Sequence, residues 1–373
     1  MLNKEFAKLL NAQILVMDGA MGTQIQSKKL SEDDFRGELF KKYNKDLKGN
    51  YDLLNLTQPE IIKEIHKSFL DKGCDFIQTN TFNSSSISQK DYGLQEKAYE
   101  LNLTGAKIAK EAVSEADSNA WVIGSIGPTN TTASISPDVT DPSKRNILFD
   151  ELVISYRECI DGLMDGGVDF LMFETIFDTL NAKAGIFAYL EKCEQTGKEI
   201  PLMISGTITD NSGRTLSGQT AEAFWTSVRH ANPCSIGFNC ALGAEQLRPH
   251  LISLNKISDI PISLHPNAGL PNEMGEYDET PSHMANIIKE MAESSLLNIV
   301  GGCCGTTPDH IEAISDAIKG IKPKKLSVRN PQSSFSGLEP LVLTDDSLFI
   351  NIGERSNVTG SAKFARLIKE KNY

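Results

Sequence analysis

The stretch DFLMFETIFDTLNAKAGIFAYLEKCE, residues 169–194, contains in one copy the unit from which most of the chain is built. Its apolar run, 169–173, has the length of a buried strand and ends at the acidic residue Glu174. An amphipathic stretch of helical length, 180–194, follows. This order predicts a βα unit with a polar side chain at the carboxyl end of its strand.

The same order recurs along the chain and predicts the fold class. Eight strand–helix pairs match an α/β protein of the (β/α)8 TIM-barrel type, whose usual size is roughly 250 residues plus insertions. A doubly wound sheet fits less well, because DGAMGT at 18–23 lacks the GxGxxG spacing. The predicted strands are 14–17, 75–79, 121–125, 169–173, 202–205, 235–238, 261–264 and 298–301. The predicted helices are 59–71, 95–115, 146–165, 180–194, 220–230, 244–255, 281–293 and 308–319.

The composition changes after the eighth pair, and we divide the chain there. Residues 1–322 form the predicted barrel domain. Residues 323–340 are rich in Pro, Ser, Lys and Gly, which is typical of a linker. Residues 341–373 contain a strand-like run, 348–352, then a loop and the start of a helix. A single βα unit cannot bury its apolar face, so we interpret this tail as the incomplete start of a second barrel.

Charge and hydropathy exclude several classes of partner. Acidic residues outnumber Lys and Arg by 49 to 37, and the net charge of -12 repels a phosphate backbone, so nucleic acid is not an expected partner. The longest early apolar run, 14–17, ends at Asp18 and is too short for a signal peptide or a membrane span. We therefore predict a cytoplasmic protein without membrane contact, which binds a small or neutral substrate.

Residues directly after the strands are the candidates for chemistry, because TIM barrels carry their active sites at the carboxyl ends of the strands. No lysine occurs at these positions, which argues against a Schiff-base aldolase. The candidates are Asp18, Asn80, Thr81, Pro128, Thr129, Glu174, Thr207, Asn239, Cys240, His265, Asn267, Cys303 and Cys304.

Three cysteines in this set predict a metal site. Cys240 follows the sixth strand and Cys303 and Cys304 follow the eighth, so their sulfurs can share one ion, for which zinc is the best match. Three protein ligands leave the fourth position open for substrate, and the Asn267 side chain is a candidate ligand there without substrate, or simply a turn residue. Buried free thiols, or a strained redox pair at Cys303 and Cys304, are the alternatives. The remaining cysteines are interpreted as core thiols: Cys74, Cys159, Cys193 and Cys234.

Two carboxyl groups, Asp18 and Glu174, are expected on the arc of the rim opposite the thiols. They are candidates for general acid and base, or for binding the ammonium of an amino acid. The turn from Gly19 to Gly22 presents backbone N–H groups that suit a carboxylate. The alternative is a helix N-cap at Asp18 and a solvated surface charge at Glu174.

Longer segments resemble a known family. The chain resembles the zinc-dependent homocysteine S-methyltransferase family and, within it, the N-terminal homocysteine-binding part of cobalamin-dependent methionine synthases. The matching segments are MDGAMGT from Met17, DLKGNYDLLNLTQPEII from Asp46, TNTFNS from Thr79, GSIGPTN from Gly124, FETIFDTLNAKA from Phe173, ISGTITDNSGRTLSGQT from Ile204, GFNCALGAEQLRP from Gly237, HPNAGLPNEMGEYDETP from His265 and GGCCGTTPDH from Gly301.

The resemblance implies a reaction and a set of site residues. Zinc would bind Cys240, Cys303 and Cys304 and take the thiol of L-homocysteine as fourth ligand, so the substrate thiolate is the nucleophile and no separate protein nucleophile is needed. The methyl donor would be methylcobalamin held by another domain or chain, and the product L-methionine. The residues placed at the homocysteine site are Asp18, Gly19, Ala20, Met21, Thr81, Glu174, Thr207 and Asn239.

The tail bears on the choice of methyl donor. FINIGERSNVTGSAKF, from Phe349, resembles the start of the pterin-binding (methyltetrahydrofolate) domain of the multidomain enzyme. The partners implied are therefore cobalamin-binding and methyltetrahydrofolate-binding domains, in cis or in trans. Two alternatives stay open: a homocysteine methyltransferase that uses S-methylmethionine or another small donor, and a homocysteine- and zinc-binding module that is inactive without further domains. A phosphate-binding barrel is a more distant alternative, because it leaves the cysteines unexplained.

Overall fold

The computed structural model describes residues 4–209, 212–272, 275, 277–326, 332–350 and 358–372. Its centre is an eight-stranded parallel sheet in the order β1-β8-β7-β6-β5-β4-β3-β2. A bridge between Met17 and Phe76 joins the first strand to the second, so the sheet curls into a barrel. The strands are β1 (Leu15–Val16), β2 (Phe76–Gln78), β3 (Trp121–Ile126), β4 (Phe170–Ile176), β5 (Leu202–Gly206), β6 (Ser235–Gly243), β7 (Ile262–Asn267) and β8 (Ile299–Val300).

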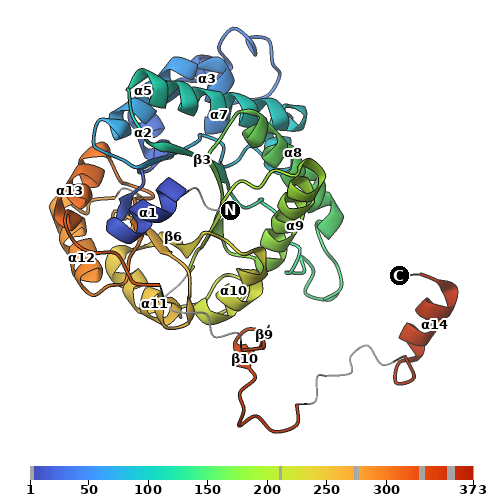
Figure 1. Cartoon of the computed structure of the whole chain (residues 1–373). Helices are drawn as coiled ribbons and strands as arrows, with labels where there is room; N and C mark the ends of the chain where they lie inside the picture. Colours follow the sequence, from blue (N-terminus) through green and yellow to red (C-terminus); the bar gives the residue numbers. More distant parts are fainter. Residues whose placement is uncertain are drawn as a thin grey trace.

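Helices surround this barrel as a ring (Figure 1), so the (β/α)8 prediction is confirmed. The eight predicted helices correspond to α5 (Pro59–Leu70), α7 (Ala98–Glu115), α8 (Phe149–Asp165), α9 (Thr179–Thr196), α10 (Ala221–Val228), α11 (Ala244–Ile257), α12 (Pro281–Glu293) and α13 (Pro308–Ile318). The additional helices are α1 (Lys4–Ala12), α2 (Met21–Ser27), α3 (Glu32–Arg36), α4 (Leu54–Thr57), α6 (Ser86–Gln89) and α14 (Ala362–Glu370). The short 3-10 helices are η1 (Tyr51–Leu53), η2 (Lys90–Tyr92), η3 (Gln95–Lys97) and η4 (Arg229–Ala231).

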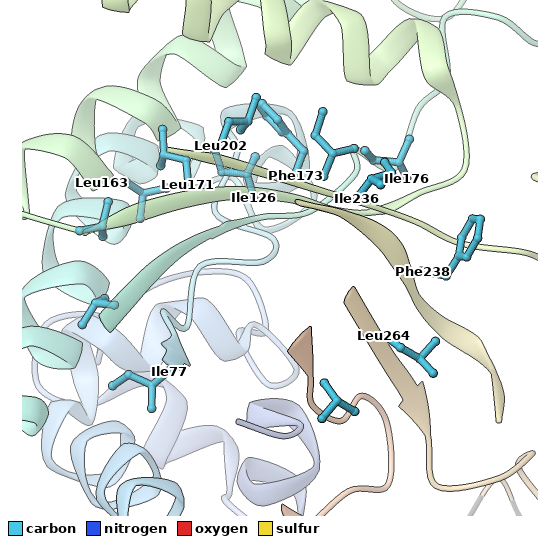
Figure 2. Close-up of a cluster of buried hydrophobic side chains, with 14 of the residues drawn as sticks. Ile77, Ile126, Leu163, Leu171, Phe173, Ile176, Leu202, Ile236, Phe238 and Leu264 are labelled. Atoms are coloured by element: carbon cyan, nitrogen blue, oxygen red, sulfur yellow. The ribbon is translucent and has the colours of Figure 1, made fainter. Parts of the chain in front are cut away.

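Alternation along the strands divides the core into two layers. In β4, Phe170 and Met172 belong to a cluster inside the barrel, whereas Leu171 and Phe173 pack outward against the helices. Period-two alternation is expected because successive side chains of a strand point to opposite faces. Figure 2 shows part of the outer layer, in which strand residues such as Leu171 lie beside Leu163 of α8.

The helix α1 closes the amino-terminal end of the barrel and is not among the helices predicted from the sequence. In Figure 1 it lies across the centre of the ring. Its Phe6 is fully buried and makes edge-to-face contacts with Phe76, Trp121 and Phe170, at centroid distances of 6.0, 5.6 and 4.8 Å. This aromatic cluster fills one end, so ligands reach the barrel from the carboxyl ends of the strands.

Part of the predicted linker is a structured hairpin. Strands β9 (Ser334–Ser336) and β10 (Pro340–Val342) pair in antiparallel fashion, and the Ser336 hydroxyl donates to the Ala223 carbonyl of α10 at 2.7 Å. Composition alone could not reveal this, because the anchoring groups are single serine and backbone hydrogen bonds. Residues 327–331 lie outside the described part of the chain.

The tail contains the predicted helix but not, in its described part, the predicted strand. The helix α14 lies outside the ring of helices in Figure 1, and none of its described side chains is buried. Residues 348–350 are not in a strand, and the rest of the predicted strand, 351–352, lies outside the described residues. A second barrel therefore stays a prediction. Within the described chain, no helix combines the length and the apolar character that a membrane crossing requires.

Candidate metal and substrate site

A polar layer continues the inner face of the barrel toward the carboxyl ends of the strands. The alternation that places Met172 inside also places Glu174 inside, and the same reasoning applies to neighbouring strands. The members of this layer are Ser125, Glu174, Ser205, Asn239 and His265. All five are buried, so the mouth of the barrel is lined with desolvated polar groups.

The three predicted metal ligands lie together. The sulfurs of Cys240, Cys303 and Cys304 are all within 4.8 Å of one another, and the Cys240 and Cys304 sulfurs are 3.7 Å apart. Cys240 and Ala241 adopt positive φ angles of 62° and 59°, where the pairing of β6 with β7 is irregular. This left-handed backbone is uncommon outside glycine, and here it turns the Cys240 side chain out of the strand alternation.

Backbone hydrogen bonds hold the two consecutive cysteines. The Cys303 N–H donates to the Pro266 carbonyl at 2.8 Å, and the Cys304 carbonyl accepts from the Ala268 N–H at 2.9 Å. Gly302, just before them, donates to the Asp18 carbonyl at 3.1 Å. The loop after β8 is thus tied to both neighbouring strands, which lets two successive residues aim at one point.

Thr306 shows why glycines flank the cysteine pair. Its hydroxyl donates to the Cys303 carbonyl at 2.6 Å and accepts from the Ala20 N–H at 3.1 Å. A Cβ on Gly302 or Gly19 would lie 2.4 or 2.7 Å from this hydroxyl oxygen, which is closer than any real contact. The glycines therefore permit the close approach of two loops.

Hydrogen bonds among the three thiols shift their pKa values in opposite directions. Donation from the Cys240 and Cys303 thiols, and from the Tyr277 phenol, lowers the pKa of Cys304 to about 3. The same hydrogen bonds raise the pKa of Cys303 well above its ordinary value. One thiolate among three close sulfurs is a cluster prepared to bind a soft cation.

Three of the four remaining cysteines are buried, as predicted for core thiols. Cys74, Cys159 and Cys234 are buried, and Cys193 is half-buried. Burial raises the pKa of Cys159 and of Cys234 to about 12, so these thiols are unreactive.

Glu174 is 8% exposed, which excludes a solvated surface charge. Its carboxylate accepts from the Ser125 hydroxyl at 2.5 Å and from the Asn239 amide at 3.2 Å. The Asn239 oxygen is itself held by the Ser205 hydroxyl at 2.7 Å and by the Thr175 N–H at 2.9 Å. Burial raises the pKa of Glu174 to about 7, although the hydrogen bond from Ser125 opposes this shift. Glu174 is thus a desolvated, preoriented carboxyl group.

Asp18 is the second buried carboxyl group. Its oxygens accept from the Gln78 N–H at 2.9 Å and the Gln78 side-chain amide at 3.2 Å, and it caps no helix. Burial, assisted by the negative charge of Glu174, raises the pKa of Asp18 to about 8. The expectation that the two carboxyl groups lie opposite the thiols is wrong. Barrel closure makes β1 the neighbour of β8, and Glu174 contacts Asn239, next to Cys240.

Most predicted site residues line one cavity of about 840 Å³ at the mouth of the barrel. They are Asp18, Gly19, Ala20, Met21, Glu174, Asn239, Cys240, Cys303 and Cys304. His265 also lines it; burial lowers the pKa of His265 to about 4, so the ring is neutral.

Outside the described lining of this cavity lie Thr81, Thr207 and Asn267 of the predicted homocysteine and zinc sites, and also the candidates Pro128 and Thr129. The Thr81 hydroxyl is 2.6 Å from the Thr79 hydroxyl and donates to the Ser125 carbonyl at 2.7 Å. The Thr207 hydroxyl and the Asn267 amide oxygen are buried without a hydrogen-bond partner among the described residues. An unpaired Asn267 oxygen suits a metal ligand, but that role and the substrate contacts of both threonines stay predictions.

Several functional neighbours escape prediction from sequence. They contact the predicted groups from other strands and loops: Gln78, Ser125, Thr175, Ser205, Tyr277 and Thr306. Alternation in β3 and β5 could have identified Ser125 and Ser205, since both share the inner face with the predicted interior residues.

Comparisons with known proteins bear on the fold and the family of this chain. The oxidized form of the Escherichia coli homocysteine methyltransferase MmuM matches with a TM-score of 0.65 and 20% identity, and its metallated form with 0.61 and 22%. Each match covers 84% of this chain and 99% of the E. coli chain, which shows a shared fold. A family model described as homocysteine S-methyltransferase matches residues 15–318, well over half of the chain. The protein is therefore a methyltransferase of the homocysteine S-methyltransferase family.

Proposed function

We propose that this chain transfers a methyl group to the thiol of L-homocysteine at a zinc ion bound by Cys240, Cys303 and Cys304, giving L-methionine. The spacing of the sulfurs carries this proposal. Two sulfurs at about 2.3 Å from a tetrahedral zinc ion are about 3.8 Å apart, and the Cys240 and Cys304 sulfurs are 3.7 Å apart. The existence of a metallated form of the E. coli relative supports it.

Each side chain of the cavity has a role in this proposal. Zinc, when bound, would supply a Lewis acid that lowers the pKa of a thiol in its fourth position. Asp18 and Glu174 hold the homocysteine ammonium, and the backbone from Gly19 to Met21 holds its carboxylate. Asn239 keeps Glu174 oriented. These contacts fix the substrate sulfur beside the three cysteines, and no protein nucleophile takes part.

For the methyl donor we propose methylcobalamin bound by another domain or chain, which makes this chain the homocysteine-activating half of a cobalamin-dependent methionine synthase in the cytoplasm. The segment FINIGERSNVTGSAKF supports this choice, together with the division into a barrel (1–322), a linker (323–340) and the start of a pterin-binding domain (341–373). Cobalamin-binding and methyltetrahydrofolate-binding domains are then the partners.

One observation favours a second candidate, a small cationic donor such as S-methylmethionine. The cavity of about 840 Å³ contains three buried carboxyl groups, from Asp18, Asp52 and Glu174. No lysine or arginine occurs among the described residues that line it. Such a cavity attracts a sulfonium or ammonium group.

The test is methionine formation by the zinc-loaded chain from homocysteine with free methylcobalamin or with S-methylmethionine. We expect methionine with methylcobalamin. Formation with S-methylmethionine alone would select the second candidate. No product with either donor would indicate a binding module without turnover and contradict the proposal.

Glu174→Gln tests the substrate site separately. We expect homocysteine to bind at least tenfold more weakly in calorimetry, because a buried charge-assisted hydrogen bond to the ammonium is worth roughly 1.5–3 kcal/mol. Zinc content should stay unchanged. Glu60→Gln, an exposed residue of α5, is the matched control. Loss of zinc in the Glu174 variant would mean that its role is misassigned.

A further inference from the structure

One wall of the cavity contains none of the groups assigned to homocysteine. It is formed by Tyr51 and Asp52 of η1 and by Phe82 and Asn83 of the loop after β2. Cavities of roughly 300–1,000 Å³ enclose drug-sized ligands, so a cavity of about 840 Å³ has room for a second molecule beside homocysteine. This wall is available to that second molecule.

Asp52 is the charged group of this wall. It lines the cavity although it is only 3% exposed. Its Oδ1 atom accepts from the Asn83 N–H and from the Ser84 hydroxyl, both at 2.8 Å. No lysine, arginine or histidine of the described chain forms an ion pair with it, and burial raises the pKa of Asp52 to about 6. A buried carboxylate without a cation beside it has unused capacity to accept hydrogen bonds.

Buried amides hold this carboxylate in place. The Asn80 amide donates to the Tyr51 carbonyl at 2.8 Å and to the Asn55 amide oxygen at 3.1 Å. The Asn55 amide in turn donates to the Asn80 carbonyl at 2.8 Å. This network fixes η1 against the end of β2, so Asp52 is preoriented before any ligand arrives.

We propose that Asp52 and Asn83 form a donor subsite that binds an N–H group of the methyl donor beside the homocysteine site. This inference rests on the proposed function, because it assigns the second ligand of the same cavity. The Asp52 carboxylate accepts the hydrogen bond, and the Asn83 side chain, which is exposed at the cavity, supplies a second polar contact. The rings of Tyr51 and Phe82 provide an apolar flank that also suits a methylated cation.

Two kinds of methyl donor carry such an N–H group. An amino-acid sulfonium such as S-methylmethionine carries an ammonium group, and the corrin ring of methylcobalamin carries carboxamide side chains. Both present N–H donors at a distance from the reacting methyl group. The subsite therefore orients the donor so that its methyl group faces the substrate sulfur.

The test is binding of each donor to the zinc-loaded full chain without homocysteine, measured by calorimetry, with steady-state KM as a second readout. Asp52→Asn keeps an acceptor oxygen for Asn83 and Ser84 but removes the charge, so the fold is retained. We expect at least tenfold weaker binding of the donor that uses the subsite. Zinc content and the KM for homocysteine should change less than twofold. Asn83→Ala, an exposed change, should weaken the same donor without affecting Tm.

The matched control is Asp46→Asn, the same chemical change at a side chain that is 96% exposed in the same segment between β1 and β2. An effect only with S-methylmethionine identifies an ammonium partner, and an effect only with methylcobalamin identifies a corrin amide. Unchanged binding of both donors in both variants overturns the subsite, as does failure of the wild-type chain to bind either donor. A higher KM for homocysteine alone also overturns it. Donor binding without methionine formation would contradict the proposed function and leave the subsite standing.

Discussion

The thiol side of the cavity (Cys240, Cys303 and Cys304) and its carboxyl side (Asp18 and Glu174) are held by different means. Backbone hydrogen bonds, two left-handed residues and tightly packed glycines fix the thiol side. On the carboxyl side, side-chain hydrogen bonds from Gln78, Ser125 and Asn239 and one from the Gln78 backbone N–H orient the oxygens. The difference indicates that the metal geometry tolerates little change, whereas the substrate contacts can be altered one at a time.

The largest effect is expected from the thiols themselves. Alanine at Cys240, Cys303 or Cys304 removes one of three ligands, so zinc should fall from about one ion per chain to near zero and methyl transfer should cease. Metal analysis after dialysis measures this. Cys193→Ala is the control, since its half-buried thiol lies outside the cluster and zinc should be retained. Full zinc content in all three ligand variants would disprove the site.

A smaller but still large effect is expected from the backbone of the thiol side. In Gly302→Ala, the new methyl group would lie 2.4 Å from the Thr306 hydroxyl oxygen. The Cys303 loop must then move, at a cost of typically 1–3 kcal/mol in the free energy of unfolding. Zinc affinity should fall although every ligand is present. Gly337→Ala, where the nearest atom is 3.6 Å away, should change neither quantity, and equal behaviour of both variants would show that the loop is not constrained.

The same difference explains what sequence could and could not predict. Strand positions and the thiol trio follow from local apolar runs and from the identity of the residues after them. The placement of Asp18 beside Gly302 depends on barrel closure between the first and last strands, which no local pattern contains. The partners of the carboxyl groups, such as Ser125, come from other strands and depend on the register between them.

Outside the barrel, prediction fails for a related reason. The helix α1 has an ordinary amphipathic sequence, and only the barrel that it closes gives Phe6 its role. The hairpin that begins in the predicted linker depends on Ser336 meeting α10, far away in sequence. The composition of one segment cannot predict these contacts, because each contact also depends on a second segment that is distant in sequence.

Asp18, on the carboxyl side, should make the free energy of unfolding depend on pH. Burial raises its pKa from 3.8 to about 8, so the folded state holds a proton that the unfolded state has released. The contribution of this proton to the free energy of unfolding is complete below pH 4 and is lost as the pH rises to 8. The free energy of unfolding then falls by up to about 1.4 kcal/mol per pH unit. Asp18→Asn removes this contribution. Urea unfolding between pH 5 and 8 should therefore show a smaller decline of stability in the variant, and parallel curves would contradict the assignment.

The smallest expected effect tests whether the Asn239 side chain orients Glu174. Ser205→Ala removes the hydroxyl that donates to the Asn239 oxygen at 2.7 Å, but the Thr175 N–H still holds that oxygen. Stability should fall by about 1 kcal/mol, and homocysteine affinity by roughly two- to tenfold, because Asn239 can tilt away from Glu174. Ser227→Ala removes another buried serine hydroxyl, at the β9–β10 hairpin, and should cost similar stability without changing homocysteine affinity. If both variants bind homocysteine equally well, Glu174 is oriented without Asn239, and the carboxyl side is as rigid as the thiol side.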